Sequence, residues 1–354
     1  MNRLDRHVLV ARLDNAGDVL LTGPAVRAVA ARASRVTYVA GPGGAEAARL
    51  LPGVTDVVVF NAPWTGYEPP PTVERDIAAF VKQVTARAPE RAIIFTSSHQ
   101  SPLPLALLLR LAGVPWIAAI SRDYPGSLLD LRLPSPGDVH EVERGLLLAT
   151  AAGYPRPGDD DGRLEIVPAA GPSCPADSLD DSLDDAFVVV HPGASVPTRG
   201  VPPALACELV QLLRERGRRV VLTASVAERS LASRVASDAD LPADALRVTR
   251  TLRDLACVLA GAEAVVCGNT GPAHLSAAVG TPVASVFAPV VPAARWHPWG
   301  VPYVLVGDQT IECAGCRARS CPIAGQPCLA PATATALADA VDTLACESVR
   351  AACP

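Results

Sequence analysis

The stretch Cys267-Gly-Asn-Thr-Gly-Pro-Ala-His-Leu-Ser-Ala-Ala-Val-Gly-Thr-Pro282 is the most informative part of the sequence, because a strand end, a glycine turn and a helix start follow one another in it. Pro272 suits a first helical position and Gly280 suits a helix end. In such a turn the backbone N–H groups of Thr270 and Gly271 lack helical partners, and the helix dipole adds about half a positive charge. The stretch therefore predicts an anion site, for which an ordinary strand-to-helix turn is the alternative.

The composition is typical of a chain with two α/β domains. Of the 354 residues, 49% are hydrophobic but only 4% are aromatic, so we expect cores of Ala, Val and Leu. The formal net charge is -5 and Lys82 is the only lysine, so no nucleic-acid partner is expected. The longest apolar stretch, residues 103–120, carries Arg110 and is broken by two prolines and a glycine, so no transmembrane segment is expected. No apolar signal precedes the first strand, and the expected location is cytoplasmic.

Apolar strands alternate with helical periods along two segments, which predicts parallel sheets with crossover helices. Residues 1–168 and 187–330 are the two predicted domains. Residues 169–186 lack an apolar period and are predicted to be a linker, and residues 331–354 carry a last helix. The expected strands are His7–Leu13, Val36–Ala40, Val57–Phe60, Ala92–Thr96 and Trp116–Ile120 in the first domain, and Phe187–His191, Arg219–Thr223, Leu246–Val248, Ala264–Cys267 and Val283–Phe287 in the second.

The loop after the first strand is a candidate site, because ligands of open parallel sheets bind at the carboxyl ends of the strands. Here Gly17 lets the backbone turn, and Asp18 lies at a helix start. A carboxylate in this place can accept a proton from a hydroxyl nucleophile, and the alternative role of Asp18 is a helix N-cap. Pro24 predicts a kink or a later start of the following helix.

Two loops of the second domain suit a nucleotide. Gly193 and Ser195 can line a diphosphate, and Arg199 can neutralise it with its forked donors, although a solvated surface arginine is the alternative. Glu228 follows the strand at residues 219–223 and can reach a ribose or sugar hydroxyl, or only begin a helix. The sequence thus predicts a donor site at the carboxyl edge of the second sheet.

Three motifs, in this order, resemble a known family. They are Val8-Leu-Val-Ala-Arg-Leu-Asp-Asn-Ala-Gly-Asp18-Val-Leu-Leu-Thr-Gly-Pro-Ala, His191-Pro-Gly-Ala-Ser195 and Asn269-Thr-Gly-Pro-Ala-His-Leu-Ser-Ala-Ala-Val-Gly-Thr-Pro282. Together they resemble glycosyltransferase family 9, the ADP-heptose heptosyltransferases, over nearly the whole chain. The resemblance implies a GT-B fold of two facing Rossmann-like domains, the first for the acceptor and the second for the nucleotide sugar, with the last helix crossing back to the first domain.

The resemblance also implies an inverting, metal-independent glycosyltransferase that moves heptose from ADP-heptose to a hydroxyl of a glycan, lipid-linked or small-molecule acceptor. Asp18 matches the catalytic base, and Gly17 and His99 lie on the acceptor side, where His99 alternatively satisfies only the local backbone. A lipid-linked acceptor implies lipopolysaccharide biosynthesis and transient contact with the inner membrane face. The donor-binding positions are Gly193, Ser195, Arg199, Glu228, Asn269, Thr270, Gly271 and His274.

The chain departs from the family pattern at two places. Asn269 stands where the family usually has Asp, and an amide only partly replaces a carboxylate that accepts bonds from sugar hydroxyls. Residues 200–202, Gly-Val-Pro, stand where members have an aromatic residue and a proline. The departures keep three alternatives open: a transferase for another nucleotide sugar, a catalytically silent sugar-nucleotide-binding protein, and a GT-B sugar-nucleotide epimerase.

Four of the ten cysteines lie close together, and the other six are scattered and mostly expected to be thiols. The close set is Cys313, Cys316, Cys321 and Cys328, with the spacing C-x2-C-x4-C-x6-C. This spacing suits a tetrahedral structural zinc, and two disulfides or free thiols are the alternatives. The resemblance implies that catalysis needs no cofactor, and a zinc ion held by four protein thiolates would be structural, because it has no open position.

Overall fold

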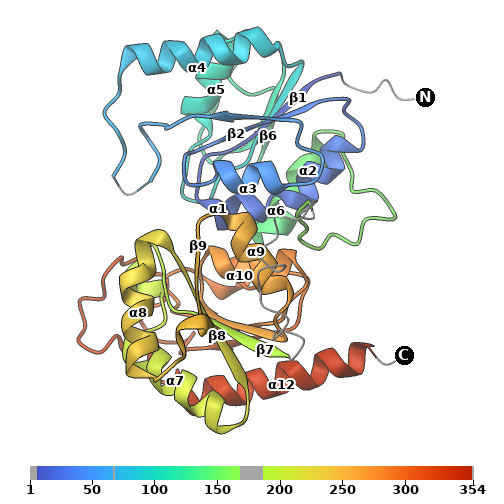
Figure 1. The fold of residues 1–354 in the computed structure, drawn as a ribbon. Coiled ribbons are helices and arrows are strands. Elements are labelled where there is room, and N and C mark those ends of the chain that lie inside the picture. Colours follow the sequence, from blue (N-terminus) through green and yellow to red (C-terminus); the bar gives the residue numbers. More distant parts are fainter. Residues whose placement is uncertain (1–5, 67, 168–185, 353–354) are drawn as a thin grey trace. The chain divides into compact units, whose positions relative to one another are not determined.

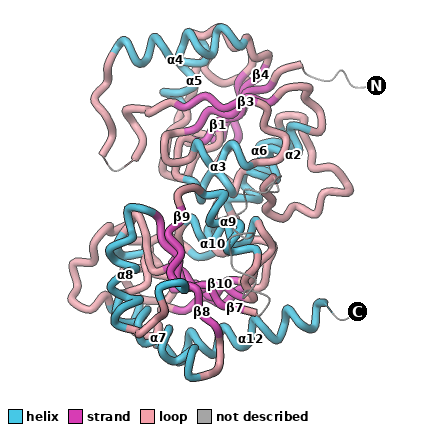
Figure 2. The backbone as a smooth tube through the Cα atoms, viewed as in Figure 1, coloured by secondary structure: helices cyan, strands magenta, loops and turns pink. Residues whose placement is uncertain are grey.

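Two α/β units make up the chain, and they divide at Val167 and Pro168 (Figure 1). The computed structural model describes residues 6–66, 68–167 and 186–352. Each unit is a parallel six-stranded sheet with helices on both faces, which confirms the predicted α/β class (Figure 2). Of the predicted linker, only Ala186 is a described residue.

The N-terminal sheet has the strand order β3-β2-β1-β4-β5-β6. Strands β1, β2 and β5 are buried at every position and are apolar except for Arg12 and Thr37, as expected for a parallel sheet that is covered on both faces. The strands are β1 (Val8–Arg12), β2 (Val36–Ala40), β3 (Asp56–Val59), β4 (Arg91–Ile94), β5 (Ile117–Ile120) and β6 (Leu131–Leu133). The sequence did not predict β6, because its three residues are half-exposed or exposed and carry no apolar run.

The helices of this unit form two groups, one on each face of the sheet (Figure 1). Helices α4 and α5 pack on one face, and α1, α2, α3 and α6 pack on the other. Pro24 lies in the first turn of α2, so the second of the two expected outcomes holds and a new helix starts there. The bounds are α1 (Ala16–Leu20), α2 (Gly23–Ala30), α3 (Ala45–Leu50), α4 (Glu74–Arg87), α5 (Leu103–Leu111) and α6 (Glu141–Ala151).

The C-terminal sheet repeats this topology, with the strand order β12-β11-β10-β7-β8-β9. Its central strands, β7 and β10, are buried at every position. The strands are β7 (Phe187–His191), β8 (Arg219–Ser225), β9 (Leu246–Thr249), β10 (Ala264–Gly268), β11 (Val283–Val286) and β12 (Tyr303–Val306). Strand β12 was not predicted, because it is an edge strand that is only partly buried.

Helices α7, α8 and α12 cover one face of the C-terminal sheet, and α9 and α10 cover the other (Figure 1). The predicted capping box of Thr251 and Asp254 is confirmed at the start of α9. The apolar face of α12 packs on α7 and on β10, β11 and β12, and its predicted crossing to the other domain stays a prediction. The bounds are α7 (Pro203–Glu215), α8 (Arg229–Asp238), α9 (Leu252–Ala260), α10 (Gly271–Ala278), α11 (Ala293–Trp296) and α12 (Ala334–Ala352).

Each sheet has one point where the strand order reverses, which is where open α/β sheets bind their ligands. In the N-terminal sheet this point lies between β1 and β4, and in the C-terminal sheet it lies between β7 and β10. The loops that follow these four strands carry most of the predicted site residues. Within the described part of the chain, no helix is long and apolar enough to cross a membrane.

Candidate functional site

A buried arginine at the end of β1 organises the loop that carries Asp18. Arg12 is 3% exposed, and its guanidinium binds three carboxylates: Nε donates to Asp14 at 2.5 Å, Nη2 to Asp18 at 2.9 Å and Nη1 to Glu141 at 3.0 Å. The same Nη2 group also donates to the hydroxyl of Ser97 at 2.8 Å, which comes from the loop after β4. The two loops of the switch point and helix α6 are thereby tied to one cation.

Burial has opposite effects on the two partners at the centre of this cluster. It would by itself lower the pKa of Arg12, but the surrounding Asp14, Asp18 and Glu141 raise that pKa instead. Burial raises the pKa of Asp14, although Arg12 and a hydrogen bond from Gln100 act against the rise. Arg12 is therefore permanently charged, and Asp14 is the carboxyl that burial pushes toward its neutral form.

The predicted acceptor-side residues all lie at this edge of the N-terminal sheet. Asp18 is in the first turn of α1, with a side chain 27% exposed, and Gly17 is buried beside it. His99 is exposed in the loop after β4, between Ser97 and Gln100 of the Arg12 cluster. Sequence reasoning missed Arg12 and Glu141, since a lone arginine at a strand end and a glutamate far along the chain carry no motif.

In the C-terminal unit, Gly193 and Glu228 lie in direct contact although they are far apart in sequence. A Cβ atom at Gly193 would overlap the Glu228 carboxylate, so only glycine allows this approach. Glu228 accepts hydrogen bonds from the Ser225 amide at 2.9 Å and hydroxyl at 2.6 Å, and the Nε2 atom of His191 lies 3.6 Å away. His191, together with Ser225, lowers the pKa of Glu228 to about 2, so this carboxylate is ionised at neutral pH.

Arg199 is held by its own backbone and by a loop that comes much later in the chain. A Cβ atom at Gly268 would overlap the Arg199 carbonyl oxygen, so β10 passes directly behind Arg199. The preceding residue, Thr198, donates its hydroxyl to the Ala318 carbonyl at 2.6 Å, and Gln326 donates to the Thr198 carbonyl at 2.7 Å. The backbone around Arg199 is therefore held by strand β10 on one side and by the loop that contains Ala318 and Gln326 on the other. Ser195, on the same loop as Arg199, is exposed.

Three of the predicted donor residues keep buried polar atoms for which the described residues offer no hydrogen-bond partner: Nε of Arg199, Oδ1 of Asn269 and Nδ1 of His274. Asn269 is 6% exposed and His274 is 5% exposed. Burial lowers the pKa of His274 to about 4, and the charges of His297 and Arg199 act in the same direction. The arrangement can receive a ligand that supplies both hydroxyl groups and phosphate oxygens.

The turn that opens α10 corrects one expectation. The Thr270 amide donates to the Gly268 carbonyl oxygen at 2.9 Å, so it is not the unpartnered amide that the sequence predicted. Thr270 has an extended backbone and directly precedes α10, which begins at Gly271. Of the two predicted anion donors, Gly271 stays a candidate.

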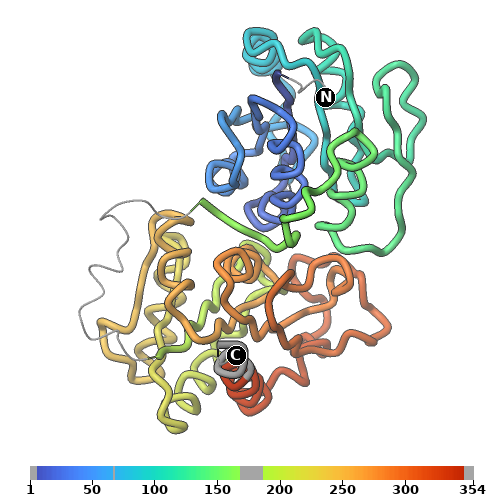
Figure 3. Tube along the Cα trace, turned by 90° about the vertical axis from the view of Figure 1, so that its right-hand side faces the viewer, coloured from blue at the N-terminus to red at the C-terminus, as the bar shows by residue number. Residues whose placement is uncertain are grey.

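The cysteine-rich loop lies between β12 and α12, on the outside of the C-terminal unit (Figure 3). Burial raises the pKa of Cys328, a hydrogen bond from Gln326 acts against the rise, and Cys321, Cys313 and Cys316 add to it. All four are free thiols. Among the described side chains, however, no three His, Cys, Asp or Glu residues are placed to hold a metal ion, so the zinc site stays a prediction. Cys257 differs from the expected thiols because it is disulfide-bonded.

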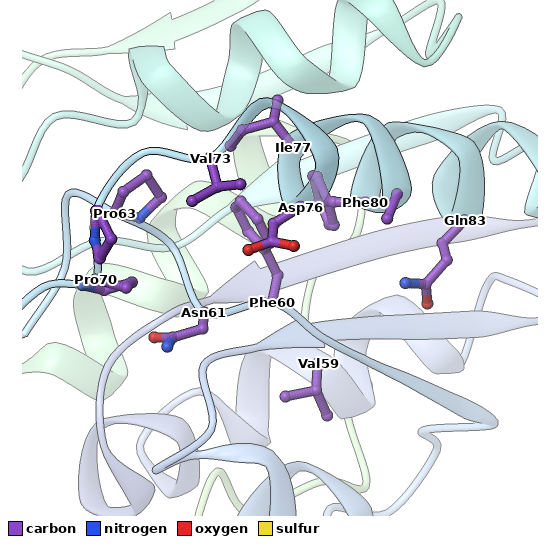
Figure 4. A pocket seen from close by; sticks show the side chains of 12 residues that line it. Val59, Phe60, Asn61, Pro63, Pro70, Val73, Asp76, Ile77, Phe80 and Gln83 are labelled. Carbon is purple, nitrogen blue, oxygen red and sulfur yellow. The ribbon is translucent and has the colours of Figure 1, made fainter.

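A cavity of about 260 Å³ lies where β3 ends, beside α4 (Figure 4). Phe60 and three prolines of the following loop form much of its wall, and Asp76 and Gln83 of α4 point toward it. None of its described lining residues is basic, and none belongs to the predicted site residues. It lies at the carboxyl edge of the N-terminal sheet, which is also the edge of the Asp18 loop.

Comparison with known proteins shows both the fold and the family. The chain superimposes on a family 9 glycosyltransferase from Veillonella parvula DSM 2008 with a TM-score of 0.75, at 14% identity over 98% of this chain and 99% of the other. It superimposes on the E. coli heptosyltransferase WaaC with ADP with a TM-score of 0.69, at 20% identity over 96% and 99%. The fold is thus that of the GT-B heptosyltransferases, as expected.

The sequence itself matches the family model for glycosyltransferase family 9 (heptosyltransferase) over residues 77–326. The chain therefore belongs to glycosyltransferase family 9. It is also 33% identical over 232 residues to lipopolysaccharide heptosyltransferase 1 of Pseudomonas aeruginosa. That alignment covers 63% of this chain and 61% of the relative, so the chain matches less than two thirds of the relative's length.

Proposed function

We propose that the protein is an inverting, metal-independent glycosyltransferase whose donor is ADP-heptose and whose acceptor is a hydroxyl of a glycan, a lipid-linked sugar or a small molecule. Family membership supports sugar transfer, and the similarity to a WaaC structure with ADP supports an adenine nucleotide. The observation that carries the proposal is the set of buried, unpartnered polar atoms on Arg199, Asn269 and His274. Each such atom costs about 1–3 kcal/mol unless a ligand completes it.

The donor would occupy the loops after β7 and β10. Arg199 would meet the diphosphate with its forked donors, with the Gly271 amide at the start of α10 as a second donor. Asn269 donates its amide nitrogen to the Ala288 carbonyl at 3.3 Å, which leaves Oδ1 as the atom that would accept a sugar hydroxyl. Glu228 is ionised and packed on Gly193, where it would accept hydrogen bonds from the nucleoside.

The acceptor would meet Asp18 at the end of β1. In the proposed step the acceptor hydroxyl gives its proton to Asp18 while its oxygen forms a bond to the anomeric carbon. The bond from that carbon to the diphosphate oxygen breaks, and the electron pair leaves with the diphosphate, where Arg199 meets the charge. Attack from the face opposite the leaving group inverts the configuration. Gly17 and His99 are the proposed neighbours of the acceptor.

A donor other than ADP-heptose is the second candidate, and Asn269 favours it. With its nitrogen bound to Ala288, this side chain offers one acceptor oxygen, whereas a carboxylate in its place could accept two hydroxyls. A sugar with a different hydroxyl pattern would fit that reduced set. If the acceptor is lipid-linked, we propose that the protein acts in the cytoplasm in transient contact with the inner membrane face.

Calorimetric titration with ADP, UDP, GDP and their sugars tests the donor. We expect ADP and ADP-heptose to bind most tightly and Arg199→Ala to weaken them about 10- to 100-fold, because a hydrogen-bonded charge pair contributes about 1.5–3 kcal/mol. Arg234→Ala, at an exposed position of α8, is the matched control and should leave binding unchanged. Preference for UDP or GDP would overturn the donor assignment, and no binding at all would favour a protein without sugar-nucleotide function.

A further inference from the structure

The cluster around Arg12 contains more negative charge than a structural ion pair needs. One guanidinium is surrounded by the carboxylates of Asp14, Asp18 and Glu141, and Arg12 itself is 3% exposed. Burying ionised groups is costly, and an apolar residue in such a place is often as stable or more stable. Asp14, which burial pushes toward its neutral form, and Glu141, which is 1% exposed, therefore cost stability, and this indicates that the cluster is maintained for another reason.

The geometry gives each member a distinct task. Arg12 uses Nε for Asp14, Nη1 for Glu141 and Nη2 for Asp18 and Ser97, so its planar group is fixed from three elements of the fold. Asp14 is in turn held by Gln100. Only Asp18 has substantial exposure among the three carboxylates, at 27% against 13% for Asp14 and 1% for Glu141. The rigid part of the cluster is inside, and its one accessible carboxylate points toward solvent.

We propose that Arg12 is a positioning residue for the transfer reaction: it fixes the Asp18 carboxylate and holds a positive charge 2.9 Å from it when the acceptor hydroxyl arrives. Asp14, Glu141 and Ser97 fix Arg12 in turn. A guanidinium suits this task because its fork binds several carboxylates in one plane, which an ammonium group does not do. The inference rests on the proposed function, in which Asp18 receives the acceptor proton.

The charged and titratable groups around Arg12 set the direction of the expected pH effect. They are Asp14 and Asp18 on the β1 loop and α1, Tyr38 on β2, and Glu141 and Arg144 on α6. Removing the positive charge of Arg12 leaves Asp18 beside two other acids, so a proton binds Asp18 more easily. Removing the negative charge of Glu141 has the opposite effect on Asp18.

The test is the pH dependence of turnover in Arg12→Gln, Arg12→Lys and Glu141→Gln. We expect Arg12→Gln to lower kcat about 100-fold with little change in donor KM, and to move the acidic limb of the profile up by about one pH unit. Arg12→Lys should have a higher kcat than Arg12→Gln but a lower one than the unchanged protein, because lysine keeps the positive charge and lacks the forked donors of the guanidinium group. Glu141→Gln should move the acidic limb down. A purely structural role would not move the two limbs in opposite directions.

The control is Arg27→Gln, in the same unit. Arg27 is also a largely buried arginine with a forked ion pair, since Nε and Nη2 bind Asp160 at 2.7 and 2.8 Å. It should lower stability without moving the pH profile. Unmoved acidic limbs in Arg12→Gln and Glu141→Gln, or a matching loss of kcat in Arg27→Gln, would overturn the inference.

A measurement without substrate separates this inference from the proposed function. In a double-mutant cycle of Arg12→Gln and Asp18→Asn, the two substitutions should couple by about fivefold or more in the unfolding equilibrium constant. If Arg12→Gln does not fold, Arg12→Lys takes its place in the cycle. Independent effects of the two substitutions would refute the positioning role even if transfer occurs. If the two substitutions couple in a protein that transfers no sugar, the proposed function would be refuted, whereas the interaction between Arg12 and Asp18 would be confirmed.

Discussion

The two switch points of the molecule have the same topology and opposite chemistry. At the end of β1, every described partner of Arg12 is in place before any ligand binds. At the ends of β7 and β10, Arg199, Asn269 and His274 keep buried polar atoms without a described partner. The same strand order thus builds one site whose central arginine has a partner at each nitrogen, although Glu141 Oε1 has none among the described residues, and one site in which Arg199, Asn269 and His274 each keep such an atom.

The difference follows from what each site would have to do. A carboxylate that takes a proton must have a fixed orientation and charge at the moment of reaction, so its partners belong to the protein. A site that binds a diphosphate and a sugar needs donors and acceptors that the ligand will satisfy, so a polar atom left unpartnered in the free protein becomes binding energy. Both sites lower the free energy of unfolding, the first through its buried carboxylates and the second through its unpartnered polar atoms.

The largest effect should come from Asp18→Asn, which breaks the first site without changing its shape. An asparagine oxygen can still accept from Arg12, but a neutral amide cannot take the acceptor proton. We expect kcat to fall by about two to four orders of magnitude, while ADP affinity stays nearly unchanged. Initial rates and calorimetry on the same preparation measure both.

Asp161→Asn is the control for this substitution, because Asp161 is an exposed carboxylate of the same unit, paired with Arg163 at the surface. Its activity should equal that of the unchanged protein. Equal activity in Asp18→Asn would remove Asp18 from the mechanism, and the contrast between the two sites would lose its functional meaning.

The second site should be disrupted by Gly268→Ala, because this substitution places a side-chain atom against the backbone of the donor loop. The new Cβ would overlap the Arg199 carbonyl oxygen, and neither backbone can move without disturbing β10 or the donor loop. We expect a loss of about 1–3 kcal/mol in stability and a clear loss of ADP affinity. Denaturant unfolding and calorimetry measure the two effects.

Gly193→Ala is the matched comparison for Gly268→Ala. Its Cβ would meet the Glu228 side chain rather than a carbonyl oxygen, and a side chain can turn away. Stability should fall less, whereas Glu228 should lose its contacts with Ser225 and His191. If Gly268→Ala leaves both stability and ADP affinity unchanged, Arg199 is not fixed in the way the structure describes.

The strands and the candidate loops could be predicted because they depend on local signals. Buried apolar runs and glycine turns predicted ten of the twelve strands, and motifs at the strand ends predicted Asp18, Arg199 and Asn269. Strands β6 and β12 were not predicted, because edge strands bury little surface and their sequences do not have to be apolar.

The partners of these residues could not be predicted, because they depend on contacts between distant parts of the chain. Glu141 reaches Arg12 across 129 positions, and Gln326 reaches Thr198 across 128. The Thr270 amide was wrongly expected to be available, since the hydrogen bond to Gly268 depends on the exact path of the turn. A motif identifies the residue that acts, but the fold decides what holds it.

A smaller effect is expected from His274→Gln, which sharpens the description of the second site. Burial lowers the pKa of His274 to about 4, so the unfolded chain binds the proton first as the pH falls. The folded state therefore loses stability between about pH 6.5 and pH 4, and above this range His274 has no such effect. The variant should lose less stability than the unchanged protein over this interval, by about 3–4 kcal/mol at most. Urea unfolding at several pH values measures the difference, and parallel curves would show that His274 is not buried as described.

The smallest expected effect is that of a chelator on turnover, and it tests whether the second site is complete once the donor is bound. If Arg199 and the backbone at the start of α10 meet the charge of the leaving diphosphate, no divalent cation is needed there, and an excess of EDTA should leave kcat unchanged. Addition of Mg²⁺ or Mn²⁺ is the control and should not raise the rate. A rate that falls with EDTA and returns with one cation would show that the protein's own donors are insufficient, so that the second site needs a metal as well as its ligand. A lower melting temperature at unchanged kcat would instead indicate a structural ion, for which the thiols of residues 313–328 are the candidate ligands.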